Sequence, residues 1–299
     1  MSLTAWSKYA CSRVSRYFPR SVANQRASVV DRPAGGPEDA SMPQIIPIPA
    51  FADNYIWVLR NDNVVAIVDP GDAAPVTAYL ERSGIAPCAI LATHHHFDHV
   101  GGNLALLAQH PVPVFGPSRE KIPGRTQAVN GGDRIVVPGI EATFDVIDVP
   151  GHTAGHVAYF GEFGGVPSLF CGDTLFTGGC GRLFEGTPGQ MWSSLSALAA
   201  LPPETRVYCG HEYTLANLRF ALAVEPGSAA LEARDAREQA KRGRGEPTVP
   251  STMGEECATN PFLRAHLPGV MAAAAAHAGH AVADDVASFA ALREWKNRF

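Results

Sequence analysis

The sequence predicts an α+β chain in which short strands and helices alternate up to about residue 213 and helices alone follow. Short apolar runs bounded by Gly, Pro, Asn or Asp recur from residue 45, which is typical of strands. Longer stretches that end at Gly or Pro lie between some of these runs and favour helices. Beyond Thr214 the strand-like runs nearly vanish. We therefore expect an N-terminal extension over 1–42, a first domain over 43–212 and a helical domain over 213–299.

Two hairpins are predicted from turn chemistry. Asn61-Asp62-Asn63 separates the apolar runs 54–59 and 64–68, and Asn and Asp favour turns. Gly164-Gly165 separates the runs 157–160 and 168–171 in the same way. Further strands are expected from residue 45 and at 89–92, 112–115, 134–137, 142–149 and 206–209.

The predicted helices are recognised mainly by where they stop. Gly84 ends a helix over 73–82, because glycine readily adopts the left-handed conformation of a helix C-terminus. Pro111 and Pro202 follow two more, because proline cannot continue a helix. The complete set of expected helices is 73–82, 104–109, 189–201, 215–223, 229–241 and 285–295.

Composition and charge exclude several classes of protein. Of the 299 residues, 46% are apolar, which is typical of a globular protein with a full core. The net charge of −5 and the pI near 6.1 argue against broad nucleic-acid binding. No run approaches the roughly 18–20 apolar residues that a membrane span needs. The six cysteines form no C-x-x-C pair, which indicates reduced thiols in a cytosolic chain.

Residues 1–42 differ in composition from the rest. Lys8 and four arginines precede the first acidic residue, Asp31, and a Pro- and Gly-rich stretch over 33–37 follows. This basic, Ser-rich composition is typical of an organellar transit peptide. A disordered tail, or translation that starts at Met42, is favoured instead because the segment lacks a clean amphipathic stripe. We expect a cytoplasmic protein, and a mitochondrial one only if the extension is a real transit peptide.

The stretch from Thr93 to His99, THHHFDH, holds four of the eleven histidines. It follows the apolar run 89–92, so its side chains are expected at the C-terminal end of a strand, where open sheets place their sites. A lone histidine there would usually be a surface or hydrogen-bonded residue. Burying several unpartnered imidazoles would be costly, however, and imidazole with carboxylate suits zinc, iron or manganese. The pattern predicts a metal site.

Three later loops repeat one arrangement, an apolar strand followed by Gly or Thr and then by His or Asp. A catalytic zinc takes three protein groups and water, so the ligands assembled in this way exceed the needs of one metal. Two metals that share a bridging carboxylate would use all of them, with Asp173 as the bridge because it has two oxygens to share. The candidate ligands are His94, His96, Asp98, His99, His152, Asp173 and His211.

Further phrases accompany the metal motif. They are Cys171-Gly-Asp-Thr-Leu-Phe, Gly179-Cys-Gly-Arg, Val207-Tyr-Cys-Gly-His-Glu-Tyr-Thr, Val224-Glu-Pro, Pro247-Thr-Val-Pro-Ser-Thr and Asn260-Pro-Phe-Leu-Arg. The metal motif resembles that of the metallo-β-lactamase superfamily. The other phrases, over about 43–299, look like the glyoxalase II (hydroxyacylglutathione hydrolase) family.

The resemblance implies a four-layer αββα sandwich over 43–212 as the catalytic domain. The helical domain over 213–299 would then bind the glutathione part of the substrate. The implied reaction is hydrolysis of S-(2-hydroxyacyl)glutathione thioesters, chiefly S-D-lactoylglutathione to D-lactate and glutathione, the second step of methylglyoxal detoxification. We expect a monomer that binds neither nucleic acid nor membranes.

The resemblance also assigns the ligands to two divalent metal ions. His94, His96 and His152 would hold one ion, Asp98, His99 and His211 the other, with Asp173 shared between them. Zinc is the default metal, and iron and manganese also occur in the family. A bridging, metal-bound hydroxide would be the nucleophile, with no separate side-chain base, so Asp98 is expected as a ligand.

Glutathione carries two carboxylates, so its site needs cations. The resemblance implies that these lie in a C-terminal Arg-x-x-Lys, here Arg293-Glu-Trp-Lys296, and adds Tyr213 beside the last metal histidine. Without the resemblance, Arg293 and Lys296 would be charges on a solvated helix face. Where many members have Lys and Tyr, this chain has Arg182 and Phe184, so the charge is kept and a hydroxyl is lost.

Other residues and functions complete the predictions. His95 should point away from the ligands by strand alternation. Asp69 and His156 are expected either to orient ligands or to make local turn hydrogen bonds. The alternative functions are a lactonase, a β-lactamase, an RNA-processing nuclease, a one-iron persulfide dioxygenase and a non-catalytic metal-stabilised scaffold.

Overall fold

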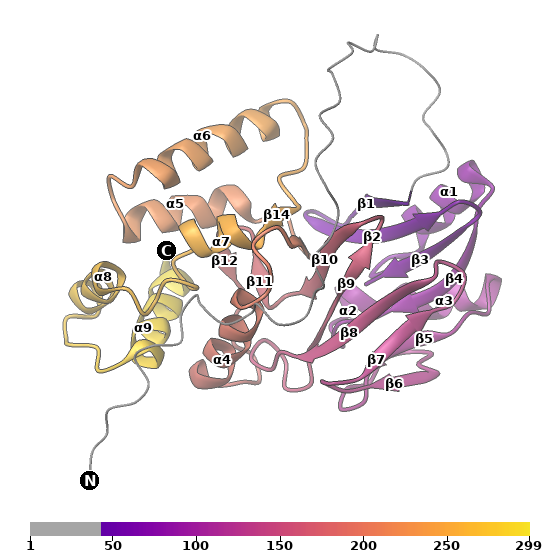
Figure 1. Ribbon diagram of the computed structural model, residues 1–299, viewed down its shortest axis with the longest axis horizontal. Helices are drawn as coiled ribbons and strands as arrows, with labels where there is room; N and C mark the ends of the chain where they lie inside the picture. Colours follow the sequence, from indigo (N-terminus) through magenta and orange to yellow (C-terminus); the bar gives the residue numbers. More distant parts are fainter. Residues whose placement is uncertain (1–42) are drawn as a thin grey trace, which may run out of the picture. The chain divides into compact units, whose positions relative to one another are not determined.

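Two six-stranded β-sheets face each other in the computed structural model, which describes residues 43–299 (Figure 1). The first sheet runs in chain order and is antiparallel from β1 to β3 and parallel from β3 to β6. Its strands are β1 (Gln44–Ala50), β2 (Asn54–Asn61), β3 (Val64–Val68), β4 (Ala86–Leu91), β5 (Val114–Pro117) and β6 (Gln127–Val129).

The second sheet has the order β14-β13-β10-β9-β8-β7. Its strands are β7 (Arg134–Val137), β8 (Ala142–Asp148), β9 (Val157–Phe163), β10 (Val166–Gly172), β13 (Arg206–Cys209) and β14 (Ser251–Thr252). Between β10 and β13 the chain forms a small antiparallel ribbon of β11 (Leu175–Phe176) and β12 (Gly179–Cys180).

Helices lie on both outer sides of the sheet pair (Figure 1). Those of the first sheet are α1 (Ala73–Ser83), α2 (Phe97–Val100) and α3 (Asn103–Gln109). On the other side are α4 (Pro188–Ala199), α5 (Thr214–Val224), α6 (Ala229–Gly243), α7 (Met253–Thr259), α8 (Pro268–Ala278) and α9 (Asp285–Arg298). We call the segment from α5 to α9 the helical tail.

Side-chain alternation along β2 explains the layers, because successive residues of a strand point to opposite faces. Trp57 and Leu59 belong to the core shared with the second sheet, together with Phe144 of β8. Ile56 and Val58 belong to the core that packs under α1 and α3. Since both faces of the first sheet are buried, the chain forms the αββα sandwich that the resemblance implied.

Most predicted elements are confirmed. The bounds of β3, β7 and β13 agree with the predicted runs, both hairpins form, and Gly84 ends α1 in the left-handed conformation. The sequence prediction missed α2, α7, α8, β6, β14 and the ribbon. Strands of two or three residues show no periodicity to detect, and α8 contains a run of alanines that has no apolar stripe.

Three expectations concern compartment and membrane. The predictions for 1–42 lie outside the described residues. Within 43–299, no helix combines the length and the apolar character that crossing a bilayer requires. The cysteines of this part of the chain are free, as the spacing predicted.

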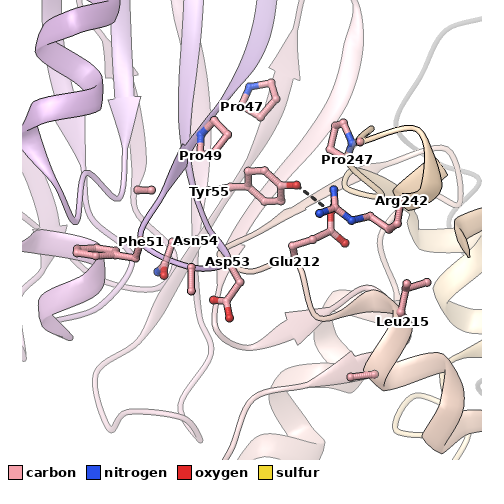
Figure 2. A pocket seen from close by; sticks show the side chains of 14 residues that line it. Pro47, Pro49, Phe51, Asp53, Asn54, Tyr55, Glu212, Leu215, Arg242 and Pro247 are labelled. Carbon is pink, nitrogen blue, oxygen red and sulfur yellow. Dashed lines mark hydrogen bonds and ion pairs between the residues drawn. The ribbon is translucent and has the colours of Figure 1, made fainter.

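A cavity of about 390 Å³ lies beside the turn between β1 and β2. Pro49 and Tyr55 line it from the first sheet and Arg242 from the end of α6 (Figure 2). The Tyr55 hydroxyl donates to Glu212 Oε2 over 2.8 Å. None of the seven predicted metal ligands lines this cavity, so it borders the candidate site without containing it.

Phe144 tests the contact between the sheets. It is fully buried in the core that residues of both sheets form, and its ring centroid lies 5.9 Å from that of Phe170 in the same sheet. We expect Phe144→Ala to lower the free energy of unfolding by about 3–5 kcal/mol, because the substitution leaves a cavity. Val136, which is 60% exposed, supplies the control: Val136→Ala should change stability by less than about 0.5 kcal/mol. Denaturant titration measures both, and similar losses in the two variants would contradict this packing.

Candidate metal centre

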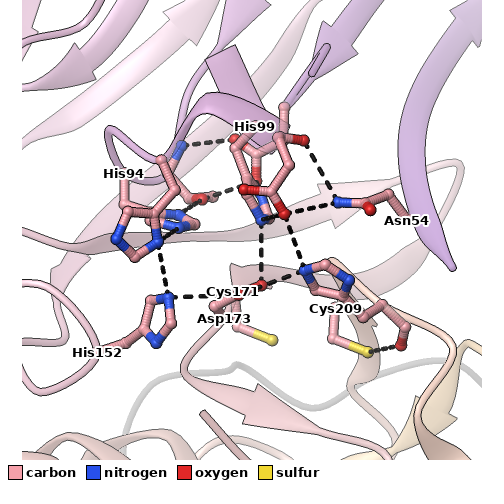
Figure 3. A network of polar contacts seen from close by, with 12 residues as sticks. Asn54, His94, His99, His152, Cys171, Asp173 and Cys209 are labelled. Atoms are coloured by element: carbon pink, nitrogen blue, oxygen red, sulfur yellow. Dashed lines mark hydrogen bonds and ion pairs between the residues drawn. The ribbon is translucent and has the colours of Figure 1, made fainter. Parts of the chain in front are cut away.

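The seven predicted ligands meet at one edge of the sandwich, where strands of both sheets end. Figure 3 shows four of them, His94, His99, His152 and Asp173, pointing toward one another. The first sheet contributes the loop after β4, and the second contributes the residues that follow β8, β10 and β13. All seven therefore lie beyond the C-terminal ends of strands, with Asp98 and His99 already inside the short helix α2.

Three imidazoles form one group of donors. His94 Nε2 lies 3.1 Å from His96 Nδ1, and His152 Nε2 lies 3.0 Å from the same atom. His94 and His152 are buried, whereas His96 is partly exposed. Three nitrogens at these separations can bind one ion from one side and leave positions open for water or substrate.

A carboxylate and two imidazoles form the second group. Asp98 Oδ2 lies 3.6 Å from His99 Nε2 and 3.4 Å from His211 Nε2. The ligand atoms of this group all lie within 4.8 Å of one another. The group can therefore hold a second ion beside the first.

Asp173 lies between the two groups. Its Oδ2 is 3.3 Å from His152 Nε2 in the first group and 3.4 Å from His211 Nε2 in the second. Its Oδ1 is 3.2 Å from His99 Nε2. One carboxylate thus reaches donors of both groups, which is the geometry that a bridging ligand needs.

Two buried atoms of this cluster lack hydrogen bonds to the described residues. They are His99 Nε2 and Asp173 Oδ1. An unsatisfied buried polar atom costs about 1–3 kcal/mol, and metal ions bound at this point would satisfy both atoms. The donor set of imidazole and carboxylate fits divalent metal ions.

Hydrogen bonds on the far side of the rings orient the ligands. His99 Nδ1 donates to Asp69 Oδ2 over 3.0 Å, and His211 Nδ1 donates to Asp53 Oδ1 over 2.8 Å. His152 Nδ1 donates to the carbonyl oxygen of Arg182 over 2.8 Å. Because Nδ1 carries the proton in each ring, Nε2 keeps its lone pair for a metal.

Sequence reasoning identified some of these supporting residues and missed others. Asp69 was predicted either to orient a ligand or to make hydrogen bonds within a turn, and it orients His99. His156 Nε2 accepts from the Asp173 amide over 3.2 Å, so it supports the bridging loop. Asp53, and Asn54, which donates to Asp98 Oδ2 over 3.0 Å, were missed. No motif marks them, because they reach the ligands only through the fold.

Two glycines allow the ligands to approach the backbone closely. A Cβ on Gly210 would lie 2.6 Å from His99 Cε1 and 2.7 Å from Asp173 Oδ1. A Cβ on Gly181 would lie 1.9 Å from the carbonyl oxygen of Asp173. Any residue with a Cβ at these two positions would therefore clash with the ligands or their backbone.

Electrostatics divides the histidines into two sets. Burial lowers the pKa of His94, His96 and His152, so these rings are neutral. Burial would also lower the pKa of His211, but Asp173 and Asp98 outweigh it and raise this pKa to about 10. The pKa of His99 is raised well above its ordinary value by Asp173 and Asp69, against the effect of burial.

The two carboxylates respond in the opposite direction. Burial alone would raise the pKa of Asp173, but His99 and His211 hold it well below its usual range. Asp98 is likewise lowered against burial, by His211 and His99. Both carboxylates are therefore ionised and available as metal ligands.

Comparisons with known proteins agree with this geometry. The family model described as "Metallo-beta-lactamase superfamily" matches residues 51–211, and "Hydroxyacylglutathione hydrolase C-terminus" matches 212–299. The hydroxyacylglutathione hydrolase of Cupriavidus taiwanensis is 56% identical over 86% of this chain and 100% of its own length. That of Alkalilimnicola ehrlichii is 58% identical with the same coverage.

The chain belongs to the hydroxyacylglutathione hydrolase family, within the metallo-β-lactamase superfamily. The fold relationship extends to solved structures. The crystal structure of TTHA1623 in a di-iron-bound form is 27% identical over 74% of this chain and 100% of that chain, with a TM-score of 0.51.

Aromatic and cationic side chains surround this hydroxyacylglutathione hydrolase centre. Tyr213 stacks on His211 with ring centroids 4.7 Å apart, and Phe184 lies with its ring centroid 5.6 Å from that of His96 and 5.2 Å from that of His152. The Arg182 side chain is exposed. Phe184 and Tyr213 thus cover imidazoles of both groups of ligands.

The two predicted cations of α9 lie in different surroundings. Arg293 is only 5% exposed, and its Nη1 donates to the Cys180 carbonyl oxygen over 2.8 Å. Lys296 is half-buried, and its Nζ donates to the Ala216 carbonyl oxygen over 2.7 Å. Neither side chain lies on a solvated helix face.

His95 joins neither group of ligands. Its Nδ1 lies 3.0 Å from Glu120 Oε2 and its Nε2 lies 3.3 Å from Glu185 Oε1. Glu120 Oε1 also accepts from the Gly155 amide over 2.9 Å. The side chain that was predicted to point elsewhere thus ties three loops of the hydroxyacylglutathione hydrolase fold together.

The number of protons released when metal binds tests the charges of His99 and His211. At pH 7 the imidazoles of His99 and His211 in the metal-free protein are positively charged, with a proton on both nitrogens, because both pKa values are raised above 7. Metal binding requires neutral imidazoles, so we expect zinc uptake to release about two protons from these rings. Affinity for zinc should rise with pH for the same reason. Calorimetric titration in buffers of different ionisation enthalpy measures this release, and identical heats in all buffers would contradict it.

Proposed function

We propose that this chain hydrolyses S-(2-hydroxyacyl)glutathione thioesters, chiefly S-D-lactoylglutathione, to D-lactate and glutathione. The observation that carries the proposal is Asp173, whose carboxylate lies between two complete groups of metal ligands. Family membership over both the sandwich and the helical tail supports the same substrate. On this proposal, 43–212 is the catalytic domain and 213–299 the substrate-binding domain.

The proposed roles of the seven ligands follow their grouping. Two divalent ions, when bound, acidify a water molecule and polarise the thioester carbonyl. His94, His96 and His152 would hold one ion, Asp98, His99 and His211 the other, and Asp173 would bridge them.

The surrounding residues complete the mechanism. Asp69 and Asp53 keep the His99 and His211 rings in one tautomer and one orientation. Phe184 and Tyr213 cover imidazole rings and exclude water from them. A thiol has a pKa near 8.5, so the leaving group departs as a thiolate without a dedicated acid.

Zinc is the metal that we propose. Both donor groups consist of imidazole nitrogen and carboxylate oxygen, which zinc binds in three-ligand catalytic sites. Iron is the second candidate, because the 27% identical TTHA1623 structure is a di-iron-bound form. Metal analysis of the purified native protein distinguishes the two. We also propose a cytoplasmic monomer, which light scattering and cell fractionation test.

Arg182, Tyr213, Arg293 and Lys296 are the proposed substrate-binding residues. Arg182 lies close enough to Lys296 to contribute to the lowered pKa of that lysine. Burial is the largest cause of that lowering, Arg293 and Arg219 add to it, and the result is a pKa of about 8. A cluster of cations beside the centre suits the two carboxylates of glutathione.

The activity itself can be tested against the alternatives. Metal-replete protein is expected to hydrolyse S-D-lactoylglutathione, measured as loss of thioester absorbance, and to leave a β-lactam and a homoserine lactone nearly unchanged. The physical reason is the cation cluster, which matches the two carboxylates of glutathione, whereas a β-lactam presents only a single carboxylate in a different shape and the lactone presents none. Lack of thioester hydrolysis by protein that holds both ions would overturn the proposal.

Lys296 tests the proposed glutathione contact. We expect Lys296→Ala to raise KM about tenfold with a smaller change in kcat, because a hydrogen bond to a charged group contributes about 1.5 kcal/mol. The wild-type KM should also rise as pH increases through about 8, since Lys296 then loses its charge. This rise should be absent in the variant.

The control for Lys296 is Arg298→Ala, at an exposed position of the same helix. It is expected to leave KM and kcat unchanged. Equal losses in kcat and kcat/KM in Lys296→Ala would show that Lys296 acts in the transition state and not in substrate binding.

A further inference from the structure

The ribbon formed by β11 and β12 receives several polar side chains of the helical tail. Four tail side chains bond to the backbone of residues 176–180. Asn260 Nδ2 donates to the carbonyl oxygens of Phe176 (3.2 Å) and Gly179 (2.9 Å). Asn217 Nδ2 donates to Thr177 O over 3.1 Å, the Gly178 amide donates to Glu256 Oε2 over 2.8 Å, and Arg293 Nη1 donates to Cys180 O over 2.8 Å.

These tail residues are buried. Glu256 and Asn260 are fully buried, and Asn217 and Arg293 are 5% exposed. Glu256 pairs with Arg234, which is itself 1% exposed. A buried ion pair costs several kcal/mol of desolvation and is weak evidence for stability alone. Its geometry here has a specific result, because it aims Glu256 Oε2 at one backbone amide of the ribbon.

Both ends of the ribbon reach the metal centre. Asp173 lies two residues before β11, and the Gly181 amide after β12 donates to Thr174 O over 3.1 Å. The next carbonyl, that of Arg182, accepts from His152 Nδ1 over 2.8 Å. A shift of the ribbon would therefore move the Asp173 carboxylate. It would also break the hydrogen bond that orients His152, a ligand of the first group.

We propose that Asn217, Glu256, Asn260 and Arg293 are positioning residues for the metal centre, acting through the ribbon on Asp173 and His152. The inference rests on the proposed two-metal centre and gives the helical tail a second role besides binding substrate. It also gives Arg293 a role that fits its burial: the guanidinium lies 4.9 Å from the Phe262 ring centroid and bonds to the ribbon.

Asn260→Asp tests this role in the full chain. The substitution keeps the size of the side chain but replaces its donor by a carboxylate oxygen that faces two carbonyl oxygens. We expect the affinity for Co²⁺ to fall about 10–100-fold, as for other residues that support metal ligands. Chelator competition and the visible spectrum of the Co²⁺ protein measure this. In the metal-free protein, hydrogen exchange at the Gly178 amide should become faster.

Asn103→Asp is the matched control. Asn103 is also fully buried and donates to a loop carbonyl, that of Pro123, over 3.0 Å, but it lies in α3 and has no bond to the ribbon. We expect it to lose thermal stability while keeping the wild-type Co²⁺ affinity within about threefold. If Asn260→Asp does not fold, Glu256→Gln carries the same test, because it removes the charge that holds the Gly178 amide.

The outcomes separate this inference from the proposed function. Wild-type Co²⁺ affinity in folded Asn260→Asp or Glu256→Gln would overturn the positioning role, as would an equal loss of affinity in Asn103→Asp. Failure of the wild-type chain to bind Co²⁺ would instead overturn the metal centre, and with it both proposals.

Discussion

The carboxylate of Asp173 is the group on which the rest of the centre depends. It is buried and ionised among three histidines, His99, His152 and His211, and only the positive charge of His99 and His211 or of bound cations makes that burial tolerable. To place it there, strands of both sheets must end at the same edge. The glycines at 181 and 210 then let two further loops approach it more closely than any side chain would allow.

Support for this carboxylate comes from successive parts of the chain. Asp53 and Asp69, in loops of the first sheet, orient His211 and His99, which both belong to the second group of ligands. The second sheet supplies His156, which accepts from the Asp173 amide. The helical tail acts from the other side, through the backbone of the ribbon. The geometry of one side chain is thus the joint product of the whole described chain.

The candidate ligands could be proposed from the sequence because four of them lie within six residues, at a spacing that a strand end alone brings together. It also predicts the hairpins and the strands in which apolar runs are bounded by turn residues. It does not predict Asp53, because nothing in the chain order relates that residue to His211. Nor does it predict the ribbon. Its two-residue strands pair with each other and are supported by hydrogen bonds from Asn217 and Asn260. Arg293 illustrates the same limit: its place in the sequence alone indicated a solvated guanidinium, whereas the structure buries it against Cys180.

The division of the ligands between the sheets has a consequence for unfolding. Bound ions would add to the packing and to the hydrogen bonds, such as that from His211 to Asp53, that hold the two layers together at this edge. Because ions bind the folded chain and not the unfolded one, the resistance of the sandwich to unfolding rises with the logarithm of free metal concentration. Most of the sandwich sequence lies between His94 and His211. This part of the chain must therefore fold and bring the two residues together before both groups of ligands can bind ions. Metal supply would then regulate how long the folded protein persists, independently of its activity.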